Sequence, residues 1–160
     1  MRAEIPKESE ENSELVIGLV GALGCDIKSA QDILSDRLRS FGYSVKEIRI
    51  SKDVIEKFGG KYEGESEKDR LEYYMNQGNK LRKEKCEDSF LALGAIAEIN
   101  QERDRLTNET DEENSPTLGK SAFIINSLKH PSETEILRSV YSDGFFQISI
   151  YEEELSLIHI

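Results

Sequence analysis

The fold is decided by one stretch near the N-terminus, which reads Glu14-Leu-Val-Ile-Gly-Leu-Val-Gly-Ala-Leu-Gly-Cys-Asp-Ile-Lys-Ser29. Its apolar first half is rich in β-branched residues and predicts a strand over 15–20, buried on both faces of a parallel sheet. Closely spaced glycines follow, and a helical pattern begins after them with Asp26 as a favourable N-cap. A strand, a glycine turn and a helix in this order are typical of a loop that holds phosphate at a helix N-terminus.

The rest of the chain continues this alternation. Helical patterns cover 27–41, 66–106 (divided at Gly78 and at 86–89) and 131–141, and strand patterns cover 43–50, 122–128 and 145–151. Polar residues over 107–119 predict a solvent loop. We therefore expect an α/β fold with three α/β/α layers around a mainly parallel sheet. The helical residues expected to face its core are Ile27, Ala30, Ile33, Leu34, Leu38, Phe41, Leu71, Tyr74, Met75, Leu81, Phe90, Leu91, Leu93, Ile96, Ala97, Ile99, Ile136, Leu137 and Val140.

Composition limits the classes of protein to which the chain can belong. Its 160 residues, 37% of them hydrophobic, suit one globular domain or part of one. Most of the net charge of -11 falls on 1–14, 107–117 and 151–154, which are predicted loops and ends, and no basic face for nucleic acid is indicated. The sequence also lacks a membrane-length apolar run and the layout of a signal peptide, so we expect a cytoplasmic protein with reduced Cys25 and Cys86.

The two ends are expected to lie outside the domain. Residues 1–13 carry charge and Pro6 without periodicity, which predicts a disordered leader before a domain over 14–154. The last six residues, Leu155-Ser-Leu-Ile-His-Ile160, match the in-frame translation of the mosaic-end adapter used in sequencing libraries. We expect a read-through artefact here, with a natural protein that continues beyond Glu154. The alternative is a natural apolar C-terminal strand.

The glycine turn departs from the phosphate loop of kinases. Gly21 and Gly24 permit the turn, but Asp26 and Ile27 stand where the pattern G-x-x-x-x-G-K-[ST] requires glycine and lysine. Lys28 and Ser29 supply a Lys-Ser pair one residue late, and one residue rotates a helical side chain by about 100°. Three interpretations stay open: phosphoryl transfer, binding of phosphate or nucleotide without transfer, and a retained shape without a ligand.

Other candidate residues follow later strands and helices. Asn126, where a kinase carries an acidic Mg²⁺ ligand, weakens the prediction of phosphoryl transfer. Asn79 and Arg82 lie three residues apart and suit a base or phosphate, unless they belong to a solvated helix face. Lys129 and His130 follow a strand at the usual ligand edge of a sheet, and Arg138 lies on the next helix, where it can reach back to that edge. His130 is a candidate catalyst or, alternatively, a hydrogen-bond partner within its loop.

Four segments together resemble one family. They are Leu15–Asp26, Gly78-Asn79-x-Leu81-Arg82, Leu91-Ala-x-x-Ala-Ile96-x-x-Ile99 and Leu128-Lys-His-Pro131…Leu137-Arg138-x-x-Tyr141. In these segments the chain resembles, over 14–151, the N-terminal domain of the anti-phage deoxycytidylate (dCTP/dCMP) deaminases. In that family a P-loop-kinase-like module with a degenerate phosphate loop precedes a zinc deaminase domain.

The resemblance implies a parent hydrolase that converts dCTP or dCMP to the deoxyuridine nucleotide and depletes a pool that phage replication needs. The zinc motifs H-x-E and P-C-x-x-C are absent here, and Ser132 stands two residues after His130 where the glutamate would be. We expect a non-catalytic module that senses nucleotide and regulates its own deaminase domain, which is where zinc belongs. The alternatives are a small P-loop nucleoside or nucleotide kinase and a scaffold that forms a homo-oligomer.

Overall fold

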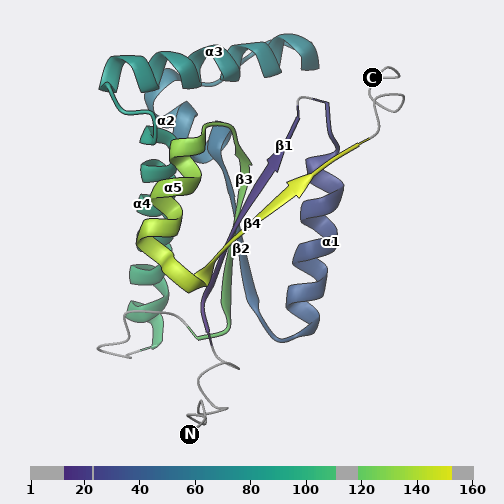
Figure 1. Ribbon diagram of the computed structural model, residues 1–160, viewed down its shortest axis with the longest axis vertical. Coiled ribbons are helices and arrows are strands. Elements are labelled where there is room, and N and C mark those ends of the chain that lie inside the picture. The colour runs from purple at the N-terminus through teal and green to yellow at the C-terminus, as the bar shows by residue number, and fades with distance from the viewer. Residues whose placement is uncertain (1–12, 23, 111–118, 153–160) are drawn as a thin grey trace, which may run out of the picture.

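Four parallel strands form the centre of the computed structural model, which describes residues 13–22, 24–110 and 119–152 (Figure 1). The leader expected over 1–13 and the adapter-like segment 155–160 therefore lie outside the described residues, Ser13 excepted. The elements in chain order are β1 (Leu15–Gly21), α1 (Ile27–Ser40), β2 (Ser44–Arg49), the π-helix η1 (Ile50–Ile55), α2 (Glu56–Gly59), α3 (Glu67–Lys85), α4 (Phe90–Thr110), β3 (Ser121–Leu128), α5 (Pro131–Tyr141), the 3-10 helix η2 (Ser142–Gly144) and β4 (Phe145–Ile150).

The strands lie in the order β2-β3-β1-β4, and every pair is parallel. From β1 the chain passes beyond the position of β3 to reach β2, and it then returns in the opposite direction to β3 and to β4. Because strand–helix–strand crossovers are right-handed, the reversal puts α1 on one face and the later helices on the other. Accordingly, α1 contacts β1, β2 and β3, whereas α4 and α5 contact each other across the opposite face (Figure 1). The expected α/β fold with a parallel sheet is confirmed.

Side chains of β3 alternate between two apolar cores. Phe123 and Ile125 belong to the larger core with α3, α4 and α5, while Ile124 belongs to the smaller core beneath α1. All three are no more than 1% exposed. A strand with both faces buried in this way reads as a continuous apolar run, which is the pattern the sequence shows.

The inward face of α1 differs from the expectation. Ile33 and Phe41 are 65% and 73% exposed, and the polar side chains of Gln31 and Ser35 are buried instead. Each makes a hydrogen bond to another element: the Asn126 amide donates to the Gln31 side-chain oxygen, and the Ser35 hydroxyl donates to Glu47. The spacing of apolar residues did not predict this face of α1, because polar side chains that have hydrogen-bond partners can take the place of apolar ones in a protein interior.

Helices α3 and α4 also correct the expected boundaries. α3 runs through Gly78 without a break, since Gly78 is buried and the Leu91 side chain packs over it. The break comes at Cys86, which has a left-handed φ of 51° and caps the helix. α4 continues to Thr110, so the predicted loop begins later, and 111–118 lie outside the described residues. Five residues expected in the core are exposed instead: Leu71, Met75, Leu93, Ala97 and Val140.

No helix in the described ranges is both long and apolar enough to span a membrane. Cys25 and Cys86 are free cysteines.

Tyr141 at the end of α5 gives the fold a dependence on alkaline pH. Burial raises its pKa from 10.0 to about 12, and its hydroxyl has no hydrogen-bond partner in the described structure. Folding therefore favours the neutral phenol. The stability that this gives is present below the unfolded pKa of about 10 and is lost as pH rises towards 12.

Replacing Tyr141 with phenylalanine should reduce the loss of stability across this range and cost little at neutral pH. Urea denaturation of both proteins at a series of alkaline pH values would test this expectation, since other titrating groups cancel in the comparison. Parallel pH profiles for the two proteins would contradict it.

Candidate functional site

The loops after β1 and β3 leave the carboxyl edge of the sheet towards opposite faces. The two strands are neighbours, but the chain leaves β1 for α1 on one face and leaves β3 for α5 on the other. Open α/β sheets bind ligands at such a switch point. The Lys129 ammonium joins the two loops here, because it donates to the Gly21 carbonyl oxygen at 3.1 Å.

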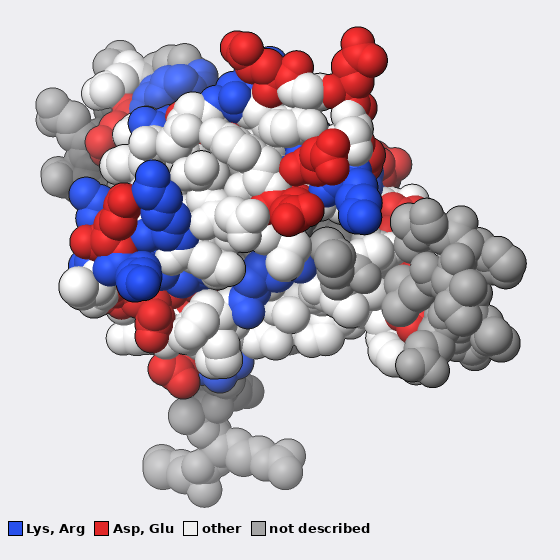
Figure 2. All heavy atoms as spheres, turned by 90° about the horizontal axis from the view of Figure 1, so that it is seen from above, with Lys and Arg blue, Asp and Glu red and all other residues white. Residues whose placement is uncertain are grey.

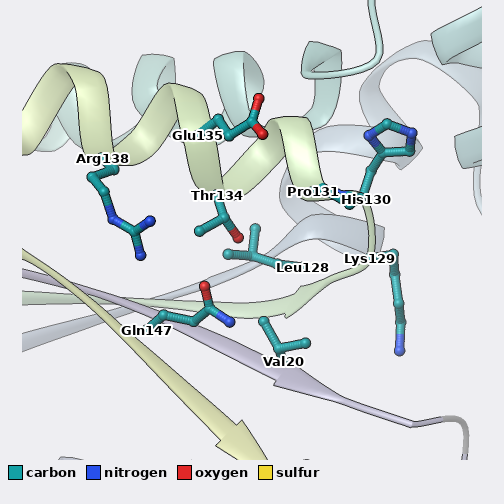
Figure 3. A pocket seen from close by; sticks show the side chains of 9 residues that line it. All are labelled: Val20, Leu128, Lys129, His130, Pro131, Thr134, Glu135, Arg138 and Gln147. Atoms are coloured by element: carbon teal, nitrogen blue, oxygen red, sulfur yellow. The ribbon is translucent and has the colours of Figure 1, made fainter.

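A pocket of about 360 Å³ opens near this switch point, between α5 and the sheet (Figure 3). Val20 and Leu128 provide apolar floor, while the side chains of Arg138, Thr134 and Gln147 point into the space above them. Its volume lies within the range of about 300–1,000 Å³ that is usual for small-molecule sites. The remaining lining residues are Lys129, His130, Pro131 and Glu135.

The pocket carries positive charge that nearby carboxylates do not neutralise. Within residues 13–22, 24–110 and 119–152, neither Lys129 nor Arg138 forms an ion pair. Glu135 also lines the pocket, but its carboxylate points away from the sheet (Figure 3). The face towards which the strands' carboxyl ends point carries charges of both signs, interspersed rather than gathered into one basic field (Figure 2). The local charge at Lys129 and Arg138 therefore suits a small anion-bearing ligand.

Groups of the chain itself lie at the glycine turn. Gly24 has a φ of 94°, and the Asp26 carboxylate caps α1 by accepting from the Ser29 backbone N–H at 3.0 Å. Hydrogen bonds from the Ser29 hydroxyl and backbone N–H lower the pKa of Asp26, which keeps it ionised. The Asp26 backbone N–H in turn donates to the Glu152 carboxylate at 2.5 Å. Two carboxylates thus stand where a phosphate would approach.

Lys28 and Ser29 are engaged along α1. The Lys28 ammonium pairs with Asp32 one turn later, and its side chain is 55% exposed. The Ser29 hydroxyl donates to the Asp26 carboxylate at 2.5 Å. Lys28 and Ser29 are therefore not arranged to bind a phosphate together.

Asn79 and Arg82 form a hydrogen bond with each other, and Arg82 also pairs with a buried carboxylate. The Arg82 guanidinium donates to Glu133 on α5 at 2.5 Å and to Asn79 at 3.1 Å. The Arg82 and Glu133 side chains are 11% and 1% exposed. Neither Asn79 nor Arg82 lines the pocket, so the structure gives them a place in a packed ion-pair network.

His130 begins α5. Its Nδ1 accepts from the Ser132 backbone N–H at 3.3 Å, and Pro131 occupies the first helical position. Nε2 lies 3.9 Å from an Asp88 carboxylate oxygen. His130 is therefore the N-cap of α5, a hydrogen-bonding role within its loop of the kind given above as the alternative to catalysis.

Comparison of the chain with protein-family models, with curated proteins and with solved structures finds no match.

Among the described residues no three His, Cys, Asp or Glu side chains gather as metal ligands. Asn126, at the position considered for a Mg²⁺ ligand, donates to Gln31. We therefore derive no metal chemistry for this part of the chain.

Three contributors to the site were not predicted. Glu133, Thr134 and Gln147 come from α5 and β4, and only Glu133 had a recognisable signal. The sequence His130-Pro-Ser-Glu133 has capping-box spacing, and the Glu133 carboxylate accepts from the His130 backbone N–H as in a capping box. Gln147 pairs in register with Gly18 of β1, and this pairing depends on which strands become neighbours.

Proposed function

We propose that the chain is a nucleotide-binding module of the P-loop-kinase-like class, which binds its ligand in the pocket between α5 and the sheet without transferring phosphate. The observation that supports this is the pair of cations, Lys129 and Arg138, that line one pocket at the switch point and have no carboxylate partner among the described residues. The two cations can bind the phosphates of a nucleotide, and the apolar floor can contact its base or sugar. The Gln147 amide and the Thr134 hydroxyl can form hydrogen bonds with the polar edges of the base or sugar.

The proposal excludes phosphoryl transfer at the glycine turn for an electrostatic reason. Kinases surround the transferred phosphate with backbone N–H groups, lysine and Mg²⁺. Here Asp26 and Glu152 bring two carboxylates to that place, and Lys28 is paired with Asp32. We further propose, on the sequence resemblance, that the module regulates a deoxycytidylate deaminase domain, which supplies the zinc and the catalysis.

Calorimetric titration with dCTP, dCMP and ATP tests the binding. We expect the alanine variants of Lys129 and Arg138 each to lower the affinity about ten-fold, because a hydrogen bond to a charged group contributes roughly 1.5–3 kcal/mol. Lys80→Ala and Arg39→Ala are matched controls on exposed faces of α3 and α1 and should leave the affinity unchanged. No heat with any nucleotide, together with a concentration-dependent oligomer, would support the scaffold alternative instead.

The same samples separate the module from a kinase. Incubation with ATP and nucleosides or nucleotides should give no phosphorylated product. Phosphorylation that disappears in Lys28→Ala would overturn the proposal in favour of the kinase alternative.

A further inference from the structure

We infer that Glu133 is a positioning residue for the pocket, because it fixes the loop that carries Lys129 and links this loop to α3. The inference rests on the proposed function for its meaning. Glu133 is 1% exposed, and its carboxylate contacts groups of the chain on both oxygens. It is therefore not available to a ligand and acts through other residues.

The loop between β3 and α5 consists of Lys129 and His130 alone. Both of their backbone N–H groups donate to the same oxygen, Glu133 Oε2, at 2.7 Å and 3.0 Å. Near the end of β3, two residues before this loop, Ser127 has a left-handed φ of 71°, a conformation that non-glycine residues seldom adopt and that surrounding contacts must maintain. The Glu133 carboxylate thus fixes the backbone from which the Lys129 side chain reaches Gly21.

Arg82 makes this buried carboxylate tolerable. Its guanidinium donates from α3 to Glu133 Oε1 at 2.5 Å, across 51 residues of sequence, and supplies the opposite charge that a desolvated carboxylate needs. Asn79 orients the same guanidinium at 3.1 Å. A continuous series of contacts therefore runs from α3 through Arg82 and Glu133 to the Lys129 loop and Gly21.

Arg138 provides the internal comparison. It lies on the same helix, more than one turn after Glu133, and has no hydrogen bond to Glu133 in the described structure. If Glu133 only stabilised the fold, its loss would change the contributions of Lys129 and Arg138 to binding by the same factor. If Glu133 positions the loop, its loss should remove the contribution of Lys129 to binding and leave that of Arg138.

A double-mutant cycle with dCTP and inorganic triphosphate as probes distinguishes these outcomes. In the wild-type background, Lys129→Ala should lower the affinity about ten-fold; in the Glu133→Gln background it should lower it less than about two-fold. Arg138→Ala should cost about ten-fold in both backgrounds. An unchanged effect of Lys129→Ala in the Glu133→Gln background would overturn the inference. If Glu133→Gln does not fold, the double variant Arg82→Gln, Glu133→Gln removes both buried charges and serves as the second background.

Amide hydrogen exchange provides a measurement that does not depend on ligand. In Glu133→Gln the amides of Lys129 and His130 should exchange at least about ten-fold faster, while amides in the last turn of α5 keep their rates. Equal protection in both proteins would overturn the positioning role. If the wild type binds neither probe, the proposed function fails, and the exchange rates alone decide whether Glu133 holds the loop.

Discussion

Arg82→Ala is expected to destabilise the fold by about 3–5 kcal/mol, because it leaves the Glu133 carboxylate buried without a counter-charge. Glu133 keeps its hydrogen bonds from the Lys129 and His130 backbone, but these donors carry no net charge. Urea denaturation followed by circular dichroism measures the free energy of unfolding. The result bears on function too, since Arg82 was a candidate ligand-binding residue in the sequence.

Lys80→Ala is the matched control for Arg82→Ala, because Lys80 lies on the same helix with its side chain 62% exposed. Its loss should change the free energy of unfolding by less than about 0.5 kcal/mol. Adding Glu133→Gln to Arg82→Ala should recover part of the loss, because the remaining side chain is then uncharged. If the Arg82→Ala protein has wild-type stability but binds nucleotide more weakly, Arg82 contacts the ligand after all.

Phe123→Ala is expected to cost about 3–5 kcal/mol, the usual penalty for truncating a fully buried phenylalanine. Phe123 is 1% exposed on the strand between β1 and β2, where it belongs to the larger core. The change would remove apolar contacts and leave a cavity that the surrounding strands cannot close. The free energy of unfolding in urea, measured at unchanged pH, gives the size of this effect.

Phe146→Ala gives the comparison for Phe123→Ala with the same side chain in the same sheet. Phe146 lies on β4, at the end of the strand order, and is 50% exposed. We expect its truncation to cost less than half as much, since much of its ring is already in water. Equal losses for the two variants would show that the assignment of Phe123 to a closed core is wrong.

Local patterns in the sequence predicted much of the architecture. The apolar run over 122–128 became β3, the helix predicted over 131–141 became α5, and Asp26 caps α1 as expected. These predictions succeeded because strand burial and helix capping depend on residues close together in the chain. For the site, the same reasoning placed Lys129 and Arg138 at one edge, and both line the pocket.

Local patterns could not predict the contacts between residues that are far apart in the sequence. In the sequence, Asn79 and Arg82 are compatible with a solvated helix face, yet the Arg82 guanidinium is buried where it pairs with Glu133. Gln31 and Ser35 lie on the inner face of α1, where Asn126 donates to the Gln31 oxygen and Glu47 accepts from the Ser35 hydroxyl. In each case the partner of a polar group decides whether it can be buried, and that partner comes from another element.

The sequence by itself determined the order along the chain of the four strands and of α1, α3, α4 and α5, although not η1, α2 and η2. It also determined the glycine turn and the absence of a kinase-like lysine at its usual place, because these are properties of neighbouring residues. Only the tertiary structure decided the order β2-β3-β1-β4, which brings the loops after β1 and β3 together. It also decided that Lys129 and Arg138 remain without ion pairs within the described ranges while Arg82 does not. The physical reason is that charge pairing and burial depend on distances in space, which helix and strand periodicities do not encode.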